Sequence, residues 1–428
     1  MESTALLTDR YELTMVSAAL RDGTADRPCV FEVFGRRLPN GRRYGVVAGT
    51  GRLAELIREF RFTDDDIAYL SDSGVVDART AAWLASYRFT GDVCGYAEGE
   101  LYFPGSPILT VEAPFAVGVV LETLILSVLN HDCAVASAAA RMVTAAHGRP
   151  IVEMGSRRTH EESAVAAARS AYLAGFASTS NLAAGRRYGV PTAGTAAHAF
   201  TLLPDSEADA FTSQIDTLGV GTTLLVDTFD IDEGIRTAVR VAGPGLGALR
   251  IDSGDLAVLA ERSRDLLDSL GAKDTRILVS GDLDEYSIAA LAAAPVDAYG
   301  AGTAVVVGSG APTAQLVYKL VEVDGRAVVK RSENKRTVGG RKYAVRRHKP
   351  TGTATEEIVS SQTQVEPRPG DRALQRPYVV GGELVPDLPA LADSRQHLAN
   401  ALVTIPWDGL KLSAGDPAIP VTMIGGER

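Results

Sequence analysis

Two residues that can take part in chemistry follow a run of small residues in the stretch Tyr188–Phe200, which reads YGVPTAGTAAHAF. The glycine and the alanines leave room for a ligand to reach the backbone. Thr195 offers a hydroxyl, and His198 offers an imidazole that is mostly neutral near pH 7 and can act as a nucleophile. Taken alone, a histidine in this setting is more often a buried, hydrogen-bonded residue than a catalytic one.

Polar residues also follow five other apolar runs at the same phase of a repeated pattern. Helix capping could account for Ser253 or Asp282. It does not account for Arg157, Arg250 and His198 together, so the pattern favours a ligand site. The six groups are Glu153/Arg157, Thr195/His198, Asp227, Arg250/Asp252/Ser253, Ser280/Asp282 and Gly302/Thr303.

Two glycine-rich turns that enter helices indicate a phosphate ligand. The turns 252–255 (DSGD) and 300–303 (GAGT) offer backbone N–H groups to an anion. Arg250 supplies a fixed positive charge beside the first turn. Asp252 and Asp282 could hold ribose hydroxyls or a Mg²⁺ ion. Together these features predict a site for a polyanionic sugar phosphate.

The residues between about 150 and 310 alternate between apolar strand-like runs and helical stretches. This alternation predicts a parallel α/β sheet, either a barrel or a doubly wound sheet. In a barrel the carboxyl ends of the strands share one rim, which would bring the polar groups together. The expected strands are Pro150–Glu153, Tyr188–Thr195, Thr223–Val226, Gly247–Ile251, Arg276–Val279 and Val296–Tyr299.

The two ends of the chain are expected to form a second domain. Residues Leu6–Leu20 have helical spacing, with Asp9 and Glu12 placed as a capping box. Cys29–Phe34 is strand-like, Leu316–Lys330 reads as a hairpin around Asp324–Gly325, and Lys335–Arg347 is basic with a glycine turn. We expect residues 1–112 and 321–428 to form a smaller α+β domain, and residues 113–320 to form an irregular (β/α) barrel-like catalytic domain.

Composition excludes several classes of protein. The chain has 428 residues and a formal net charge of −10, which argues against general nucleic-acid binding. Cys29, Cys94 and Cys133 lack CxxC spacing, so they suit a reducing compartment and give no zinc signature. No export signal is visible, and the apolar segment Ala113–Leu129 is too short and too polar to span a bilayer. It reads as a buried helix, and we expect a cytoplasmic protein with no membrane or nucleic-acid partner.

Seven motifs, taken in order and spacing, resemble those of the nicotinate phosphoribosyltransferases over nearly the whole chain up to about Arg347. The resemblance implies a type II phosphoribosyltransferase fold and a homodimer in which the N-terminal segment of one subunit helps to complete the active site of the other. The motifs are LLTDRYELTM (6–15), EMGSRRTHE (153–161), AGFASTSN (174–181), GTAAHAF (194–200), RIDSGDL (250–256), GDLDEY (281–286) and GAGTAVVVGSGAPTAQLVYKL (300–320).

The resemblance also implies a reaction. Nicotinate and phosphoribosyl pyrophosphate (PRPP) would give nicotinate mononucleotide and pyrophosphate, with Mg²⁺ as cofactor and with hydrolysis of ATP as a co-substrate, in NAD synthesis. His198 would be phosphorylated by ATP, with Arg250 and Asp252 as further catalytic residues. The nicotinate-binding residues would be Tyr11, which stacks on the pyridine ring, Arg157, which pairs with the carboxylate, Thr195 and Arg250. The PRPP-binding residues would be Ser253, Gly254, Gly281, Asp282, Gly302 and Thr303.

Some residues depart from the family pattern. The arginine motif more often reads EFGLRR in this family, whereas this chain has Met154 and Ser156 in place of the aromatic residue and the leucine. Ala199 stands where serine is frequent. These changes keep the first arginine of the motif, Arg157, but leave open how side chains would pack around the pyridine ring of nicotinate. His160 reads as a helix-start residue.

Three other functions remain open from the sequence. The chain could be a related phosphoribosyltransferase that acts on nicotinamide or quinolinate, or a catalytically silent nucleotide sensor with the same fold. A basic patch at Arg341–Lys349 could bind RNA, although a solvated or phosphate-facing loop is the favoured interpretation there. The sequence identifies neither the metal ligands nor the ATP-binding residues. It also does not resemble the PRPP loop of type I phosphoribosyltransferases, because Asp227 is followed by Thr228 instead of a second acid.

Overall fold

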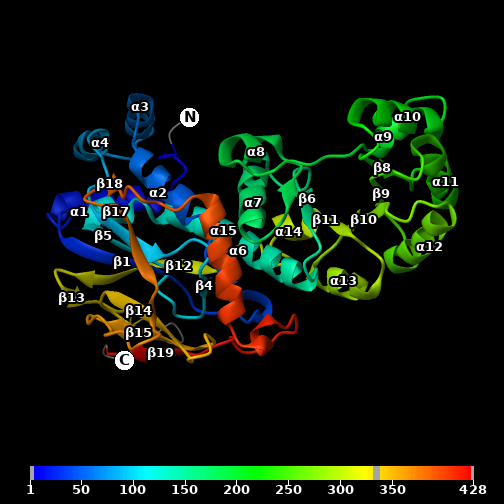
Figure 1. Ribbon diagram of the computed structural model, residues 1–428. Helices are drawn as coiled ribbons and strands as arrows, with labels where there is room; N and C mark the ends of the chain where they lie inside the picture. The colour runs from blue at the N-terminus through cyan, green and yellow to red at the C-terminus, as the bar shows by residue number, and fades with distance from the viewer. Residues whose placement is uncertain (1–3, 331–337, 426–428) are drawn as a thin grey trace. The chain divides into compact units, whose positions relative to one another are not determined.

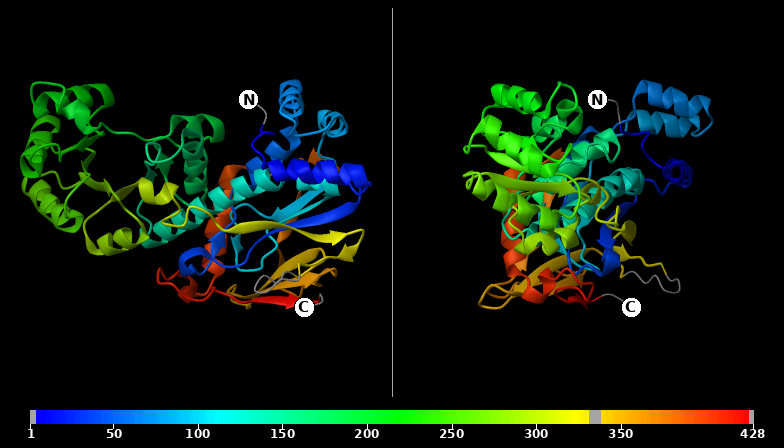
Figure 2. Two further views of the ribbon diagram at one scale, coloured as in Figure 1. Left: turned by 180° about the vertical axis from the view of Figure 1, so that it is seen from behind. Right: turned by 90° about the vertical axis from the view of Figure 1, so that its right-hand side faces the viewer.

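The computed structural model describes residues 4–330 and 338–425 and divides the chain into two compact units. Unit 1 comprises Met1–Ser137 and Ala311–Arg428, and unit 2 comprises Ala138–Gly310. In Figure 1, unit 2 is the green to yellow-green part of the chain, and Figure 2 gives two further views. Unit 1 is the larger one, in contrast to the smaller mixed domain expected from the sequence. The reason is that the long helix α6 (Glu122–Ala145) packs its N-terminal part into the core of unit 1.

Unit 2 is built on a six-stranded parallel sheet, which confirms the expected fold class. Its strand order is β7-β6-β11-β10-β9-β8, and every neighbouring pair is parallel. The strands are β6 (Ile151–Glu153), β7 (Ser178–Thr179), β8 (Thr223–Leu225), β9 (Ala248–Ile251), β10 (Arg276–Gly281) and β11 (Ala298–Ala301). The sheet is open and curved, and α11 (Ile231–Ala242), α12 (Leu256–Ser269) and α13 (Glu285–Ala290) lie on its outer side (Figure 1).

The remaining helices of unit 2 connect the strands. They are α7 (Glu161–Leu173), α8 (Leu182–Tyr188), α9 (His198–Thr201), α10 (Glu207–Leu218) and α14 (Thr303–Val306). His160 is the N-cap of α7, and its Nδ1 accepts a hydrogen bond from the Glu162 N–H, so the helix-start interpretation is confirmed. Gly271 follows the C-cap of α12 with a left-handed backbone (φ 81°), which glycine adopts readily.

The expected strand at Tyr188–Thr195 is wrong. Tyr188 is the last residue of α8, and Gly189 ends that helix in the left-handed conformation. Residues 189–197 form a loop with one isolated bridge, between Thr179 and Thr192. Pro191 lacks an N–H group for a ladder, and the strand beside β6 is instead the two-residue β7, which is too short to give a periodic signal.

Unit 1 joins the two chain ends in a seven-stranded sheet of order β13-β12-β1-β5-β3-β17-β18. Strand β1 lies between β5 and β12 and is antiparallel to both, with Cys29 opposite Val323. The predicted hairpin around Asp324–Gly325 is confirmed as β12–β13. The strands are β1 (Pro28–Gly35), β3 (Asp92–Tyr96), β5 (Leu109–Pro114), β12 (Leu316–Val323), β13 (Arg326–Ala327), β17 (Gln375–Val380) and β18 (Glu383–Leu384).

A four-stranded sheet of order β16-β14-β15-β19 and several helices complete unit 1. The predicted basic segment Lys335–Arg347 begins outside the described residues, and its described part continues into β14. The elements are β14 (Lys342–His348), β15 (Ala354–Ser361), β16 (Arg372–Ala373), β19 (Val421–Ile424), β2 (Gly45–Val46), β4 (Leu101–Tyr102), α1 (Arg10–Asp22), α2 (Thr50–Glu59), α3 (Asp64–Asp72), α4 (Ala78–Ala85), α5 (Phe115–Val119) and α15 (Leu391–Thr404).

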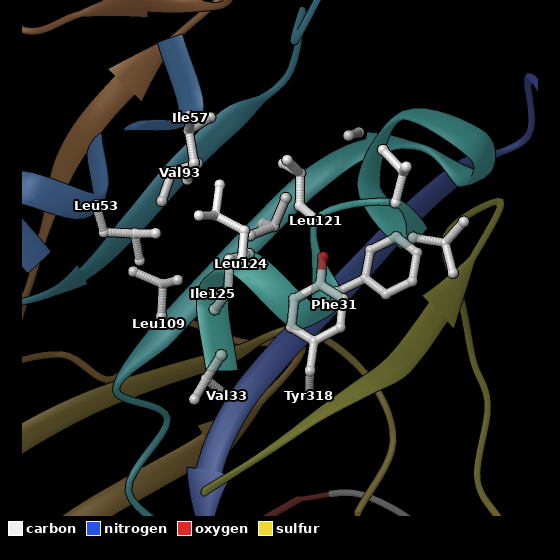
Figure 3. Close-up of a cluster of buried hydrophobic side chains, with 14 of the residues drawn as sticks. Phe31, Val33, Leu53, Ile57, Val93, Leu109, Leu121, Leu124, Ile125 and Tyr318 are labelled. Atoms are coloured by element: carbon white, nitrogen blue, oxygen red, sulfur yellow. The ribbon is translucent and has the colours of Figure 1, made fainter. Parts of the chain in front are cut away.

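Aromatic and aliphatic side chains from both chain ends share the core of unit 1. The rings of Phe31 and Tyr318 stack with centroids 5.0 Å apart, and Leu121 and Ile125 lie beside them (Figure 3). By length and composition alone, the helical segment Phe115–Ala145 could cross a membrane, so it is longer than the sequence suggested. However, 67% of its most apolar window is buried inside the structure, as expected of a core helix.

The basic stretch of β14 is neither an RNA-binding patch nor a solvated loop, because its cations are used inside unit 1. The Arg346 side chain is fully buried and makes ion pairs with Glu100 and Glu357. Burial alone would raise the pKa of Glu100, but Arg346, His397 and Arg372 hold that pKa well below its usual range. Arg346 therefore joins β14 to Glu357 of the neighbouring strand β15 and to Glu100, which precedes β4.

Replacing Arg346 with alanine should strongly destabilise the protein, because two buried carboxylates would lose their partner. Breaking a buried ion pair typically costs about 3–5 kcal/mol. Urea unfolding followed by circular dichroism measures this effect, and the exposed Lys349→Ala variant on the same stretch should stay within about 0.5 kcal/mol of wild type. Equal unfolding midpoints for the two variants would contradict the buried network.

The predicted capping box at Asp9 and Glu12 is not formed. Asp9 occupies the N-cap of α1 without a side-chain cap bond. The Glu12 carboxylate turns inward, where it accepts hydrogen bonds from the N–H and hydroxyl of Thr123 and from the hydroxyl of Thr8. Burial raises the pKa of Glu12 to about 7, despite these bonds.

Glu12 should therefore make stability depend on pH. The folded protein favours the neutral carboxyl, so this contribution is complete below pH ~4.5 and is lost as the pH rises through about 7. Between pH 5 and pH 8, the wild type should lose on the order of 1–3 kcal/mol more unfolding free energy than Glu12→Gln. Urea titrations of both proteins at several pH values measure this difference, and parallel pH curves would rule out the raised pKa.

Candidate active site

The carboxyl ends of the parallel strands of unit 2 surround a polar cavity of about 270 Å³. Parallel strands end at the same edge of a sheet, so the loops that follow them converge as the sequence predicts. The cavity is lined by Met154, Arg157, Arg158, Arg250, Asp252, Ser280, Gly281, Asp282, Gly300, Gly302 and Thr303. Ser280 lines it, as do seven of the residues that were given a catalytic or substrate-binding role from the sequence, namely Arg157, Arg250, Asp252, Gly281, Asp282, Gly302 and Thr303.

A hydrogen-bonded group fixes Arg250 at the end of β9. Its Nη2 donates to Asp252 Oδ1 at 2.7 Å, and its Nε donates to Ser280 Oγ at 2.7 Å. Its Nη1 reaches Thr195 Oγ1 at 3.4 Å, which ties the loop before α9 to the sheet. Partial burial alone would raise the pKa of Asp252, but Ser280 and Arg250 lower it below its usual value. Arg250 and Asp252 are thus a charged and oriented pair.

His198 begins α9 and faces the end of β8. Its Nδ1 lies 3.0 Å from Thr228 Oγ1, and its Nε2 lies 4.0 Å from Asp227 Oδ1. The Asp227 side chain is 2% exposed, whereas that of His198 is 43% exposed. A buried carboxylate beside an accessible imidazole favours a proton on the nitrogen that faces it.

Asp227 also joins the histidine to the next strand end. Its Oδ2 accepts hydrogen bonds from the Asp252 N–H at 2.8 Å and from Ser253 Oγ at 3.0 Å. Its buried Oδ1 has no hydrogen-bond partner among the described residues, which leaves it available to the imidazole. Sequence reasoning placed Asp227 at a strand end but gave it no role. Its partners depend on the pairing of β8 with β9, which a single sequence does not show.

Arg157 lies on a tight turn after β6. The Arg158 N–H donates to the Gly155 carbonyl at 2.8 Å and closes this turn. The Arg157 side chain is exposed, lines the cavity, and makes no hydrogen bond or ion pair with the described part of the chain. It is available for an anionic ligand. Arg158 lines the same cavity and was not singled out from the sequence.

Glycines on two of the loops are required by the backbone. Gly254 and Gly281 have φ values of 91° and 131°, in the region that side chains disfavour. At Gly300 a Cβ would lie 2.9 Å from the sulfur of Met154. The methionine that departs from the family pattern therefore packs on the glycine-rich turn, and these loops present backbone to the cavity.

Other residues proposed from the sequence lie outside this cavity. Ser253 and Gly254 are exposed on the turn that leads into α12. Tyr11 belongs to α1 of unit 1, where its side chain is exposed (46%). Burial of the hydroxyl and the neighbouring Glu122 and Glu12 raise the pKa of Tyr11 to about 12, so this phenol is neutral at pH 7.

The cavity offers only a few oxygen ligands for a metal. Within residues 4–330 and 338–425, no three or more His, Cys, Asp or Glu side chains cluster as a metal site. Asp282 is exposed at the cavity, and Asp252 contributes a second carboxylate that Arg250 and Ser280 already bond. This donor set fits Mg²⁺, which commonly binds one or two carboxylates together with substrate phosphates.

A larger cavity of about 490 Å³ lies in unit 1 beside β14 and β17. None of the strand-end residues lines it, and its Arg341 is already paired with Glu112 at 2.6 Å. Size alone therefore does not identify the functional site. The smaller cavity is the candidate site, because charged groups and glycine turns converge there.

Comparisons with known proteins agree with the geometry. The family model described as nicotinate phosphoribosyltransferase (NAPRTase) N-terminal domain matches residues 6–130. The chain is 60% identical to nicotinate phosphoribosyltransferase pncB1 of Mycobacterium tuberculosis, over 98% of this chain and 95% of that protein. It is 38% identical to the nicotinate phosphoribosyltransferase of Bacillus subtilis, over 81% of this chain and 73% of the relative.

A solved structure extends the similarity to the whole fold. The crystal structure of human nicotinic acid phosphoribosyltransferase superimposes with a TM-score of 0.84 at 26% sequence identity. The superposition covers 97% of each chain. Both units described above therefore have counterparts in one solved protein.

Proposed function

The chain belongs to the nicotinate phosphoribosyltransferase family, and on that premise we propose that it transfers the phosphoribosyl group of PRPP to nicotinate, coupled to ATP hydrolysis. The products are nicotinate mononucleotide, pyrophosphate, ADP and phosphate, in NAD synthesis from nicotinate. The observation that carries this proposal is the cavity in which Arg157 and Arg250 meet the glycine turns that follow β10 and β11. All of these substrates are small, soluble molecules, so we place the enzyme in the cytoplasm.

Arg157 is proposed to bind the nicotinate carboxylate. A guanidinium holds a planar carboxylate with two parallel hydrogen bonds, and this side chain has no competing partner in the described chain. Arg250 and Thr195 would complete the pyridine site from the neighbouring loops. Tyr11 would stack on the ring in a homodimer, where the exposed N-terminal segment of one subunit serves the site of the other.

The glycine turns are proposed to hold the phosphoribosyl group. Gly281, Gly302 and Thr303 would offer backbone and a hydroxyl from the wall of the cavity. Ser253 and Gly254 would add donors from the exposed turn that follows Asp252. Asp282 would bind ribose hydroxyls or, with Asp252, a Mg²⁺ ion. When bound, that ion would neutralise charge on the pyrophosphate.

The transfer step needs no general base. The pyridine nitrogen of nicotinate already carries a lone pair, and it forms the new bond to ribose C1 while the bond from C1 to the pyrophosphate oxygen breaks. The protein contributes by holding the ring in line with C1 and by placing donors against the departing pyrophosphate. This agrees with a cavity lined by arginines and glycine-rich turns.

His198 is proposed to carry the phosphoryl group from ATP. With a proton on Nε2 beside Asp227, Nδ1 accepts a hydrogen bond from the Thr228 hydroxyl, which must turn away to free the lone pair of Nδ1. That lone pair then attacks the γ-phosphorus, the bond to the bridging oxygen breaks, and ADP departs. Water later takes the phosphoryl group from the histidine, so ATP is hydrolysed overall. The phosphorylated form would bind substrates more tightly through added contacts at the cavity.

Product analysis tests the proposal. Protein incubated with nicotinate, PRPP, ATP and Mg²⁺ should yield nicotinate mononucleotide, pyrophosphate and ADP in equal amounts, resolved by liquid chromatography. A silent nucleotide sensor on this fold would bind ATP and give no mononucleotide. Mononucleotide formed without any ADP would retain the transferase and remove the ATP coupling from the proposal.

A further inference from the structure

A buried carboxylate without a cation stands at the end of β6. The Glu153 side chain is 1% exposed and has no ion pair within the described residues. Its Oε1 accepts a hydrogen bond from the Gly155 N–H, and its Oε2 accepts one from Thr179 Oγ1. Burying a carboxylate without a cation costs free energy. We therefore expect such a group where its hydrogen bonds hold other parts of the structure in place.

Thr179 of β7 links Glu153 to two loops by hydrogen bonds. Its hydroxyl oxygen also accepts from the Asn181 N–H at 3.0 Å. Its own N–H donates to the Pro191 carbonyl, and its carbonyl accepts from the Ala193 N–H, both at 2.9 Å. Thr179 therefore holds the start of the loop that continues to Thr195 and His198.

The Asn181 side chain bonds to the turn that carries Arg157. Its Nδ2 donates to Ser156 Oγ at 3.0 Å, while its Oδ1 caps α8. Ser156 replaces a leucine of the usual family motif, so this side-chain link belongs to the present sequence. Gly155 is tightly enclosed as well, because a Cβ there would lie 2.2 Å from a methyl of Val306. We call this hydrogen-bonded group the clasp; its residues are Glu153, Gly155, Ser156, Thr179 and Asn181.

We propose that the clasp positions Arg157 for the carboxylate of nicotinate, with Glu153 and Thr179 as its central positioning residues. This inference rests on the proposed function. The Arg157 side chain has no contact of its own that would fix it, so its direction depends on the turn that the clasp holds. Glu153 pairs through its backbone with Ala301 of β11, but within the described chain the Thr179 hydroxyl bonds only to Glu153 and Asn181. Loss of that hydroxyl should therefore disturb the arginine turn more than the PRPP-binding turns after β10 and β11.

Thr179→Val and Thr179→Ser form a matched pair that tests the clasp. Valine keeps the shape but removes the hydroxyl that joins Glu153 to Asn181, whereas serine keeps it. We expect Thr179→Val to raise the KM for nicotinate about tenfold with little change in the KM for PRPP. Thr179→Ser should behave as wild type. Ser156→Ala, which removes only the outer link, should raise the KM for nicotinate roughly threefold.

Hydrogen–deuterium exchange supplies a readout that does not depend on activity. The amides of residues 153–158 and of Asn181, whose N–H bonds to the Thr179 hydroxyl, should exchange faster in Thr179→Val than in Thr179→Ser. The amides of β8, β9 and β10 should be unchanged. A folded valine variant with wild-type exchange and wild-type KM for nicotinate would overturn the clasp, as would equal rises in both KM values. If the valine variant does not fold, the amide exchange and the KM for nicotinate of Ser156→Ala test the clasp instead. A wild-type protein without nicotinate turnover would refute the proposed function, and exchange would still test the clasp.

Discussion

Replacing His198 with alanine is expected to abolish the acid-labile label that the protein acquires from γ-³²P-ATP. The same change should remove the stimulation of pyrophosphate release by ATP, leaving a slow, ATP-independent transfer. The loss in the ATP-stimulated rate should be on the order of 10²-fold or more, because His198 does not line the cavity itself and no histidine among the lining residues of the cavity could replace it. Acid and base treatment of the labelled protein identifies a phosphohistidine.

Asp227→Asn is the matched test of how His198 is oriented. The amide keeps the size of the buried group and removes the charge that lies 4.0 Å from Nε2. Labelling should be slower than in the wild type but detectable, and the KM for nicotinate without ATP should not change. Full labelling of His198→Ala would show that ATP phosphorylates another residue, and the coupling assigned to His198 would then be wrong.

Replacing Arg157 with alanine is expected to raise the KM for nicotinate by on the order of 10²-fold, because two charge-assisted hydrogen bonds are worth about 1.5–3 kcal/mol each. Arg157→Lys should recover only part of this loss, since an ammonium cannot match both carboxylate oxygens. Steady-state kinetics with nicotinate varied at saturating PRPP and ATP measures both effects.

Two further arginines serve as controls for Arg157. Arg186 lies in the last turn of α8, outside the cavity, so Arg186→Ala should leave the KM for nicotinate unchanged. Arg158 shares the cavity with Arg157. If Arg158→Ala has the large effect and Arg157→Ala does not, the carboxylate ligand is the neighbouring arginine and the assignment from the motif fails.

The parallel sheet and the grouping of strand-end residues could be predicted from the sequence for a physical reason. Strands buried on both faces give continuous apolar runs, and parallel connections place all their carboxyl ends at one edge. Five expected strands coincide with β6, β8, β9, β10 and β11 to within a few residues. Seven of the proposed site residues consequently meet in one cavity.

The remainder depends on contacts between segments that are distant in sequence. The loop 189–197 looked like a strand because it is apolar, but Gly189 and Pro191 end regular structure there. Asp227 and Glu153 became important only when β8 met β9 and β6 met β7. The cations of β14 looked like a surface patch, yet Arg346 is enclosed by carboxylates that lie 246 and 11 residues away along the chain. Neither hydrophobic periodicity nor motif spacing shows which distant side chains come into contact.

The central claim is that this site recognises the carboxylate of nicotinate during phosphoribosyl transfer. Initial rates of pyrophosphate release from PRPP, measured side by side with nicotinate, nicotinamide and quinolinate, test it most directly. We predict ATP-stimulated turnover with nicotinate, and a kcat/KM at least about tenfold lower with nicotinamide, because an amide leaves Arg157 without its anionic partner. A preference for nicotinamide or quinolinate, or no turnover with any of the three, would contradict the account.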